Sequence, residues 1–315
     1  MTAGDQPNDS KFTLGTAQLG MDYGVTNTRG KPSHNEAISI IQKAVASGVV
    51  NIDTARSYGD AESRIGEALM NNRWKEKVNI ITKLKLPENI NLYEKEKIGV
   101  AVEKSIFSSC QNLRLKQLPV LLLHKWKHRF DFQETIWKRL LELKKDGYIT
   151  SLGVSVYTPE ETIQAIEDSE IEHIQLPFNL LDGRWKTAGI PEYVRQRKEV
   201  LIYARSIFLQ GLLISDLSAW IKLKDFDGRT WINKLNKLVE DLGRESRADL
   251  CCAYVRSQPW IKSVVVGLES LSQLEENIKL FQKPLLNEQE CQRIEVELND
   301  VPEQLLNPSQ WKIHH

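Results

Sequence analysis

The sequence has little of several features that place proteins in specialised classes. Lys plus Arg and Asp plus Glu both number 42 among the 315 residues, so the formal net charge is zero. A neutral chain produces no overall field that would attract nucleic acid or an anionic membrane surface. No apolar run approaches the roughly 20 residues that span a bilayer, and no signal-peptide core follows the polar start of the chain. We therefore expect a soluble cytoplasmic protein without nucleic-acid or membrane partners.

Cysteine is also scarce. The four cysteines, Cys110, Cys251, Cys252 and Cys291, show no spacing typical of metal ligands. Adjacent cysteines such as Cys251 and Cys252 rarely pair with each other, so buried free thiols in a reducing compartment are a simpler interpretation than a disulfide framework. We predict no metal site and no disulfide scaffold.

The sequence does contain a regular alternation of apolar strands and amphipathic helices. Hydrophobic residues make up 41% of the chain, which is enough for a substantial core. The predicted strands start near residues 12, 49, 78, 118, 149, 173, 199 and 263. Eight strand–helix units without an antiparallel interlude predict the α/β class and a (β/α)8 TIM barrel. A doubly wound sheet would have fewer strands and a phosphate fingerprint after the first, and the loop at residues 15–20 lacks that fingerprint.

The same patterns predict the helices and the domain organisation. We expect a single domain over residues 1–315, with a barrel core over about 12–281 and a C-terminal helical extension over 286–315. Ser33, with Glu36 three residues later, is a plausible cap for the first long helix. The other main helices are expected over 59–69, 96–113, 132–145, 159–166, 231–242, 248–258 and 270–281, and 205–230 is expected to be a long aromatic connection.

Four ionisable side chains follow successive predicted strands. Asp53 ends the second strand and Tyr58 lies in the loop after it. Lys83 follows the third strand and His124 the fourth. Each has an ordinary structural interpretation when taken alone, such as a cap for Asp53 or a lysine reaching for solvent at Lys83. Because the carboxyl ends of neighbouring parallel strands meet at one rim of a barrel, where such folds carry their chemistry, we predict that the four lie together.

These four residue types suit carbonyl reduction. A phenol has a pKa near ~10 and donates a proton poorly at neutral pH. A neighbouring cation lowers that pKa, and Lys83 can supply the charge while Asp53 orients it. His124 can donate a hydrogen bond to the carbonyl oxygen that Tyr58 protonates. The protein has no hydride donor of its own, so this chemistry requires a nicotinamide cofactor.

The chain resembles the aldo-keto reductases from Phe12 to about Phe281. The similarity rests on the first motif of that family and on the lysine and histidine at the matching strand ends, here Asp53, Thr54, Ala55, Tyr58, Gly59, Glu62, Gly66, Lys83 and His124. The resemblance implies that Asp53, Tyr58, Lys83 and His124 are the catalytic tetrad. It also implies a barrel that binds NADP or NAD in an extended pose without a Rossmann domain.

The positions that the resemblance assigns to the cofactor match less evenly. Ser155 and Gln175 stand where the family holds the carboxamide, but Val156 replaces an Asn, so that hydrogen bond is lost. Arg205 stands where a tyrosine usually stacks on the nicotinamide, and its planar guanidinium can also stack. The residues expected at the cofactor are Gly15, Thr16, Ala17, Asp53, Ser155, Gln175, Arg205, Ser206, Leu209, Gly211, Gly267, Ser270, Gln273, Glu276 and Asn277.

The start of the last barrel helix resembles the family's adenosine-binding segment. The basic residues that many members place against a 2′-phosphate are missing, and Glu269 adds a negative charge. An acid there can accept from the free 2′-hydroxyl of NAD and repels a phosphate. Gln273, Ser270 or Lys262 could still contact a phosphate, which leaves NADP open. We expect NAD(H) to be tolerated at least as well as NADP(H).

The expected function is an NAD(P)-dependent aldo-keto reductase that reduces a small aldehyde, ketone or sugar-like carbonyl, or forms it by alcohol oxidation. The alternative is a nucleotide-binding regulatory subunit of the same fold with little turnover. Nothing in the sequence favours a purely structural protein. Aromatic residues in the predicted loops suit sugars and apolar aldehydes alike, or simply pack the loops: Tyr23, Trp126, Phe130, Trp185, Trp220 and Phe226.

Overall fold

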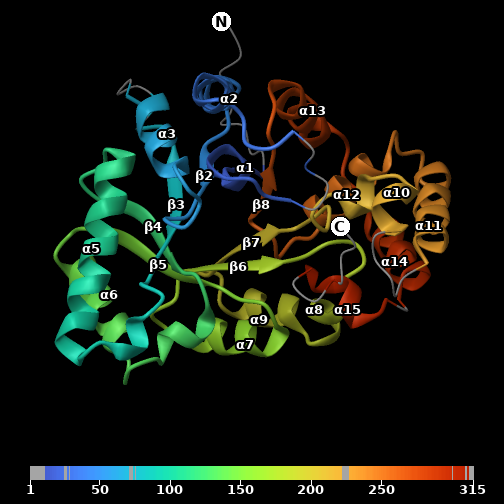
Figure 1. Cartoon of the computed structure of the whole chain (residues 1–315). Coiled ribbons are helices and arrows are strands. Elements are labelled where there is room, and N and C mark those ends of the chain that lie inside the picture. The colour runs from blue at the N-terminus through green and yellow to red at the C-terminus, as the bar shows by residue number, and fades with distance from the viewer. Residues whose placement is uncertain are drawn as a thin grey trace, which may run out of the picture.

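Eight parallel strands, hydrogen-bonded in chain order, close into a barrel because β1 also pairs with β8 (Figure 1). The structure is a computed structural model that describes residues 11–24, 27, 29–70, 74, 76–221, 227–299, 301–308 and 311. The strands are β1 (Phe12–Gly15), β2 (Asn51–Asp53), β3 (Asn79–Lys83), β4 (Leu118–Leu123), β5 (Ile149–Ser155), β6 (His173–Pro177), β7 (Leu201–Arg205) and β8 (Ser263–Gly267). The predicted (β/α)8 barrel is confirmed.

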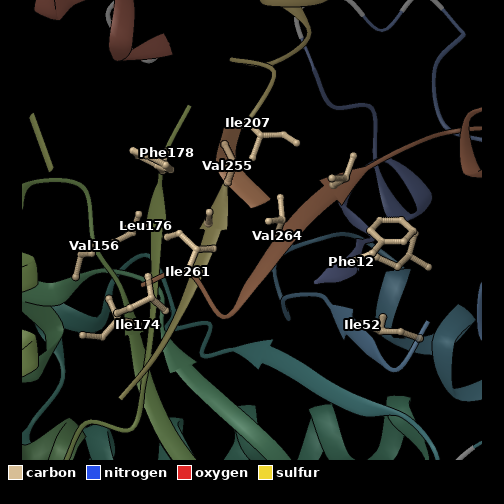
Figure 2. Packing of buried hydrophobic residues seen from close by; sticks show 14 of the residues in the cluster. Phe12, Ile52, Val156, Ile174, Leu176, Phe178, Ile207, Val255, Ile261 and Val264 are labelled. Atoms are coloured by element: carbon tan, nitrogen blue, oxygen red, sulfur yellow. The ribbon is translucent and has the colours of Figure 1, made fainter. Parts of the chain in front are cut away.

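The strands are nearly continuously apolar because both of their faces are buried. Successive side chains of a strand point to opposite faces. Ile80 therefore joins the large cluster between the strands and the helices, whereas Ile81 belongs to a small cluster inside the barrel with Leu122 and Val265. Figure 2 shows residues of the large cluster, including Phe12 and Val264.

The helices surround the barrel, and α13 packs beside α2 where the ring closes (Figure 1). They are α1 (Ala17–Gly20), α2 (His34–Ala46), α3 (Ala61–Ala68), α5 (Lys95–Leu113), α6 (Thr135–Lys145), α7 (Pro159–Glu167), α8 (Arg184–Thr187), α9 (Ile190–Gln196), α10 (Leu217–Ile221), α11 (Gly228–Asp241), α12 (Arg247–Arg256), α13 (Leu271–Gln282), α14 (Glu288–Glu297) and α15 (Glu303–Leu306), with the 3-10 helices η1 (Ile90–Leu92), η2 (Trp126–Arg129) and η3 (Leu212–Ile214). Ser33 caps α2 by accepting from the Glu36 N–H, as predicted.

Several predicted boundaries are wrong. The helix expected from residue 132 begins at Thr135, because Phe132, Gln133 and Glu134 have φ angles of 54°, 55° and 63°, which belong to the left-handed region. The helix expected from residue 59 begins at Ala61. The stretch 205–230, expected as a connection, contains η3, α10 and the start of α11.

After α13, the described residues form α14 and α15, and polar contacts join α14 to the helices of the barrel. The Tyr254 hydroxyl donates to Glu295 at 3.0 Å, and Lys186 forms an ion pair with the same carboxylate. All four cysteines are free thiols, three of them buried and Cys110 half-buried. Among the described residues, no helix is both long and apolar enough to cross a membrane.

Candidate active site

A cavity of about 480 Å³ opens at the carboxyl ends of the strands. The last residues of six strands line it: Gly15, Asp53, Lys83, Ser155, Arg205 and Gly267. Gln175 from β6 and His124, the residue after β4, complete the contribution of all eight strands. The strand ends therefore meet at one rim of the barrel, as predicted.

Lys83 and Asp53 form a buried ion pair at the base of this cavity. The Lys83 ammonium donates to Asp53 Oδ1 at 2.7 Å, to Asp53 Oδ2 at 2.9 Å and to the Thr54 carbonyl at 2.9 Å, which uses its three protons. Burial is the largest single effect and acts to lower the pKa of Lys83, but Asp53 and Tyr58 together outweigh it, and the net pKa is raised. The lysine is therefore held as a cation.

Tyr58 lies above this pair. The Lys83 ammonium is 5.1 Å from the centre of the phenol ring. The loop that carries Tyr58 requires glycine at position 59. Gly59 has a φ of +54°, and a Cβ there would lie 2.1 Å from the Gly20 carbonyl oxygen. Burial raises the pKa of Tyr58 above its ordinary value, while Lys83 lowers it. The expected effect of Lys83 is present, but the expected net lowering is wrong because burial is the larger effect.

His124 faces the same space from the end of β4. Its ring centre is 6.2 Å from that of Tyr58, and the rings meet edge to face at 77°. Burial, together with the charges of Lys83 and Arg205, lowers the pKa of His124 to about 3. The imidazole is therefore neutral near pH 7 and has one N–H to donate.

The predicted cofactor residues line the rest of the cavity with two exceptions. Those that line it are Gly15, Thr16, Ala17, Asp53, Ser155, Gln175, Arg205, Ser206, Gly211, Gly267, Gln273, Glu276 and Asn277. Leu209 is buried in the hydrophobic core, and its N–H donates to the Ser206 carbonyl. Ser270 caps α13 by accepting from the Gln273 N–H. Capping and core packing explain why these two side chains lie apart from the cavity.

Gln175 contacts Asp53 as well as the cavity. Its Nε2 donates to Asp53 Oδ1 at 2.7 Å, so this carboxylate accepts from both Lys83 and Gln175. Val156, the next residue after β5, is fully buried in the core.

Arg205 stacks on Tyr157, which no sequence motif had indicated as a site residue. The guanidinium carbon is 4.6 Å from the centre of the Tyr157 ring, and both residues line the cavity. Tyr157 is 49% exposed although it comes only two residues after the end of β5. Its position just beyond a strand end is the sequence feature from which Tyr157 could have been predicted as a site residue.

Most of the aromatic residues proposed for the substrate loops pack the structure instead. Tyr23 lines the cavity. The three tryptophans donate their indole N–H groups to protein acceptors: Trp126 to Gln164, Trp185 to Asp182 and Trp220 to the Leu212 carbonyl. Phe130 packs edge-on against Trp126. Phe226 lies outside the described residues.

The far end of the cavity, at the start of α13, is acidic. Glu269 and Gln273 bond each other reciprocally: Gln273 Nε2 donates to Glu269 Oε1 at 2.9 Å, and the Glu269 N–H donates to Gln273 Oε1 at 2.8 Å. Glu276 also lines this end. Among the described residues that line the cavity, the only Lys and Arg side chains are Lys83 and Arg205.

A closed (β/α)8 barrel with polar side chains converging at the carboxyl ends of its strands is the architecture of a barrel enzyme. The chain matches the Aldo/keto reductase family over residues 11–298, and it belongs to that family. It is therefore an oxidoreductase of the class that uses a nicotinamide cofactor.

Individual relatives are distant. The uncharacterized oxidoreductase YqkF of Bacillus subtilis is 24% identical over 90% of this chain and 95% of its own length. Methylglyoxal reductase DkgA of Escherichia coli is 30% identical over 44% of this chain and 47% of its own length. Two solved structures share the fold. The holo form of an aldo-keto reductase from Bacillus halodurans has a TM-score of 0.74 and 21% identity, with 94% of this chain and 95% of that chain covered. Glycerol dehydrogenase from Gluconobacter oxydans has a TM-score of 0.70 and 23% identity, with 95% and 93% covered.

Proposed function

We propose that this protein catalyses the nicotinamide-dependent interconversion of a small aldehyde, ketone or sugar-like carbonyl and its alcohol, with Tyr58 as the proton donor and acceptor. The observation that carries the proposal is the buried Lys83–Asp53 pair, whose ammonium lies 5.1 Å from the centre of the Tyr58 ring, with neutral His124 beside that ring in one cavity. The methylglyoxal reductase similarity supports a small carbonyl substrate.

The cavity suits an extended nucleotide. Where β1 and β8 meet, a Cβ on Gly15 would lie 3.1 Å from the Gly267 nitrogen, and one on Gly267 would lie 2.3 Å from Gln18 Oε1. Glycine at both positions therefore lets β1, β8 and the Gln18 side chain lie close together in the wall of the cavity. Ser155 and Gln175 would hold the nicotinamide amide, Ser206 and Gly211 the pyrophosphate, and Asn277 the adenosine end. The cofactor supplies hydride chemistry when bound.

The protein's own part in reduction is proton transfer. A bound cofactor would supply the hydride to the carbonyl carbon, and as the C=O π bond breaks the Tyr58 hydroxyl would give its proton to the oxygen. The His124 N–H donates a hydrogen bond to the same oxygen and holds it in place. The Lys83 cation stabilises the phenolate that Tyr58 becomes, and Asp53 keeps the cation in position. A proton from solvent then restores Tyr58, and alcohol oxidation reverses these transfers.

We infer that NAD(H) binds at least as well as NADP(H). A 2′-phosphate carries nearly two negative charges and needs basic partners to offset its desolvation. The described residues at the α13 end of the cavity offer Glu269, Gln273 and Glu276 instead. The Glu269 carboxylate, which accepts from Gln273 Nε2, would also accept from a 2′-hydroxyl.

A steady-state assay tests the function. The purified protein is given NADH or NADPH with a panel that includes methylglyoxal, benzaldehyde and glyceraldehyde, and cofactor oxidation is followed by absorbance. We expect turnover with at least one carbonyl. Tight nucleotide binding without turnover on the panel or on the corresponding alcohols would instead favour a regulatory subunit.

A further inference from the structure

We propose that Arg205 is an anion-recognition residue, so that the carbonyl substrates of this enzyme carry a carboxylate or phosphate group within a few bonds of the reacting carbon. This inference rests on the proposed function and names its substrate class.

The guanidinium of Arg205 has few protein partners. It contacts Ser206 Oγ at 3.4 Å and the Val156 carbonyl at 3.5 Å, both at the long limit of a hydrogen bond. A guanidinium has five N–H donors. Among the described residues, it forms no ion pair with a carboxylate, in contrast to Arg184 and Arg129, which pair with acidic groups. Most of its donor capacity is therefore available to a ligand in the cavity.

Arg205 lies in the part of the cavity where the substrate carbonyl is expected to bind. It lines the same cavity as Tyr58 and His124. Its charge lowers the pKa of both residues, so it acts on the two groups that would flank the carbonyl oxygen. The other cation of this cavity, Lys83, is neutralised by Asp53. Arg205 thus provides the uncompensated positive charge among the described residues of the mouth.

Tyr157 packs its ring against the guanidinium. The cation lies 4.6 Å from the ring centre, a distance at which a cation and an aromatic face attract each other. A planar guanidinium presents paired N–H groups that match the two oxygens of a carboxylate or phosphate. Stacking against the nicotinamide is the competing role. The oxidised nicotinamide ring would be cationic and would repel a guanidinium in contact with it, whereas the reduced ring would be neutral, so charge opposes stacking in the oxidised complex only.

Matched substrates test the proposal. Values of kcat/KM are measured for glyceraldehyde 3-phosphate against glyceraldehyde, and for succinic semialdehyde against butanal. The proteins are wild type, Arg205→Met, Arg205→Lys and the control Lys125→Met. Lys125 is exposed and its charge also acts on His124, but it does not line the cavity.

We expect wild type to prefer the charged member of at least one pair, and the preferred pair distinguishes phosphate from carboxylate. In Arg205→Met the charged-to-neutral ratio should fall about tenfold to a hundredfold, as for the loss of a charge-assisted hydrogen-bond pair. Arg205→Lys should retain part of the ratio, and Lys125→Met should keep it within about threefold.

Two results would overturn the proposal: no preference for a charged substrate in wild type, or an equal loss on both members in Arg205→Met together with weaker NADH binding by fluorescence titration. The second result would assign Arg205 to the cofactor. If wild type turns over no carbonyl at all, the proposed function fails separately. Calorimetric titration of wild type and Arg205→Met with succinate and inorganic phosphate then tests whether Arg205 binds anions. Equal binding of these probes by the two proteins would refute anion recognition by Arg205.

Discussion

The Lys83 ammonium rests on both carboxylate oxygens of Asp53, at 2.7 and 2.9 Å, and the two residues are only 1% and 4% exposed. The pair joins the ends of β3 and β2 beneath Tyr58. A buried charge that loses its partner is strongly destabilising, because its desolvation is no longer offset. The same contact that would tune the chemistry therefore also stabilises the barrel.

Asp53→Asn should lower the free energy of unfolding by about 3–5 kcal/mol, because it leaves the Lys83 cation buried without a counter-charge. The double variant Asp53→Asn/Lys83→Met should recover much of this loss. Urea unfolding of the single and double variants measures the coupling. The control Arg195→Met breaks an exposed ion pair with Glu192 and should cost less than about 1 kcal/mol. A similarly small cost for Asp53→Asn would refute the account of the pair.

Tyr58→Phe should reduce kcat by about 10²–10⁴-fold, the usual contribution of a positioned general acid. NADH affinity should change little, because the hydroxyl is lost from the carbonyl end and the nucleotide residues are untouched. Single-turnover rates and fluorescence titration separate the two effects. Tyr148→Phe, which removes a hydroxyl from a ring packed on Phe107 outside the cavity, is the control. Near-normal turnover in Tyr58→Phe would exclude it as the proton donor.

Stability should fall as the pH is lowered, partly through His173. Burial lowers the pKa of His173 to about 4 in the folded protein, whereas an unfolded histidine has a pKa of about 6.5. Between these values the unfolded chain binds the proton and the native chain does not, so the free energy of unfolding decreases as pH falls through this window. His173→Gln should reduce that decrease by on the order of 1–3 kcal/mol between about pH 7 and about pH 4.

The control for this experiment is His34→Gln, which changes a histidine whose side chain is 50% exposed. Urea unfolding at a series of pH values provides the slopes. Identical slopes for wild type and His173→Gln would contradict the assignment of His173 as a buried neutral group.

Glu269→Gln should improve NADP(H) binding by about threefold to tenfold at low salt, because it removes a negative charge from the adenosine end. The gain should shrink as ionic strength rises. Glu275→Gln is the matched control, since Glu275 lies on α13 but does not line the cavity. Fluorescence titrations with NADH and NADPH provide the dissociation constants. A preference of wild type for NADPH by a hundredfold or more would show that a basic partner of the 2′-phosphate exists.

Much of the fold was predictable because its signals are local. A strand buried on both faces must be apolar throughout, as Leu118–Leu123 is, and a helix start needs a cap such as Ser33. Boundaries failed where backbone conformation does not follow residue type. Phe132, Gln133 and Glu134 adopt positive φ although none is a residue that favours it. The sequence also did not indicate that Leu209 and Ser270 lie outside the cavity, because core packing and helix capping direct their side chains elsewhere.

The sequence by itself determined the order of the strands and the placement of Asp53, Tyr58, Lys83 and His124 at their ends, because periodicity and chain position specify both. Only the tertiary structure decided how distant strand ends meet. Gln175 donates to Asp53 across 122 positions of sequence, and Arg205 lies on Tyr157 from another strand end. The net pKa directions were also decided there, because they depend on burial as well as on the neighbouring charges. For Tyr58, burial prevails over the lysine beside it.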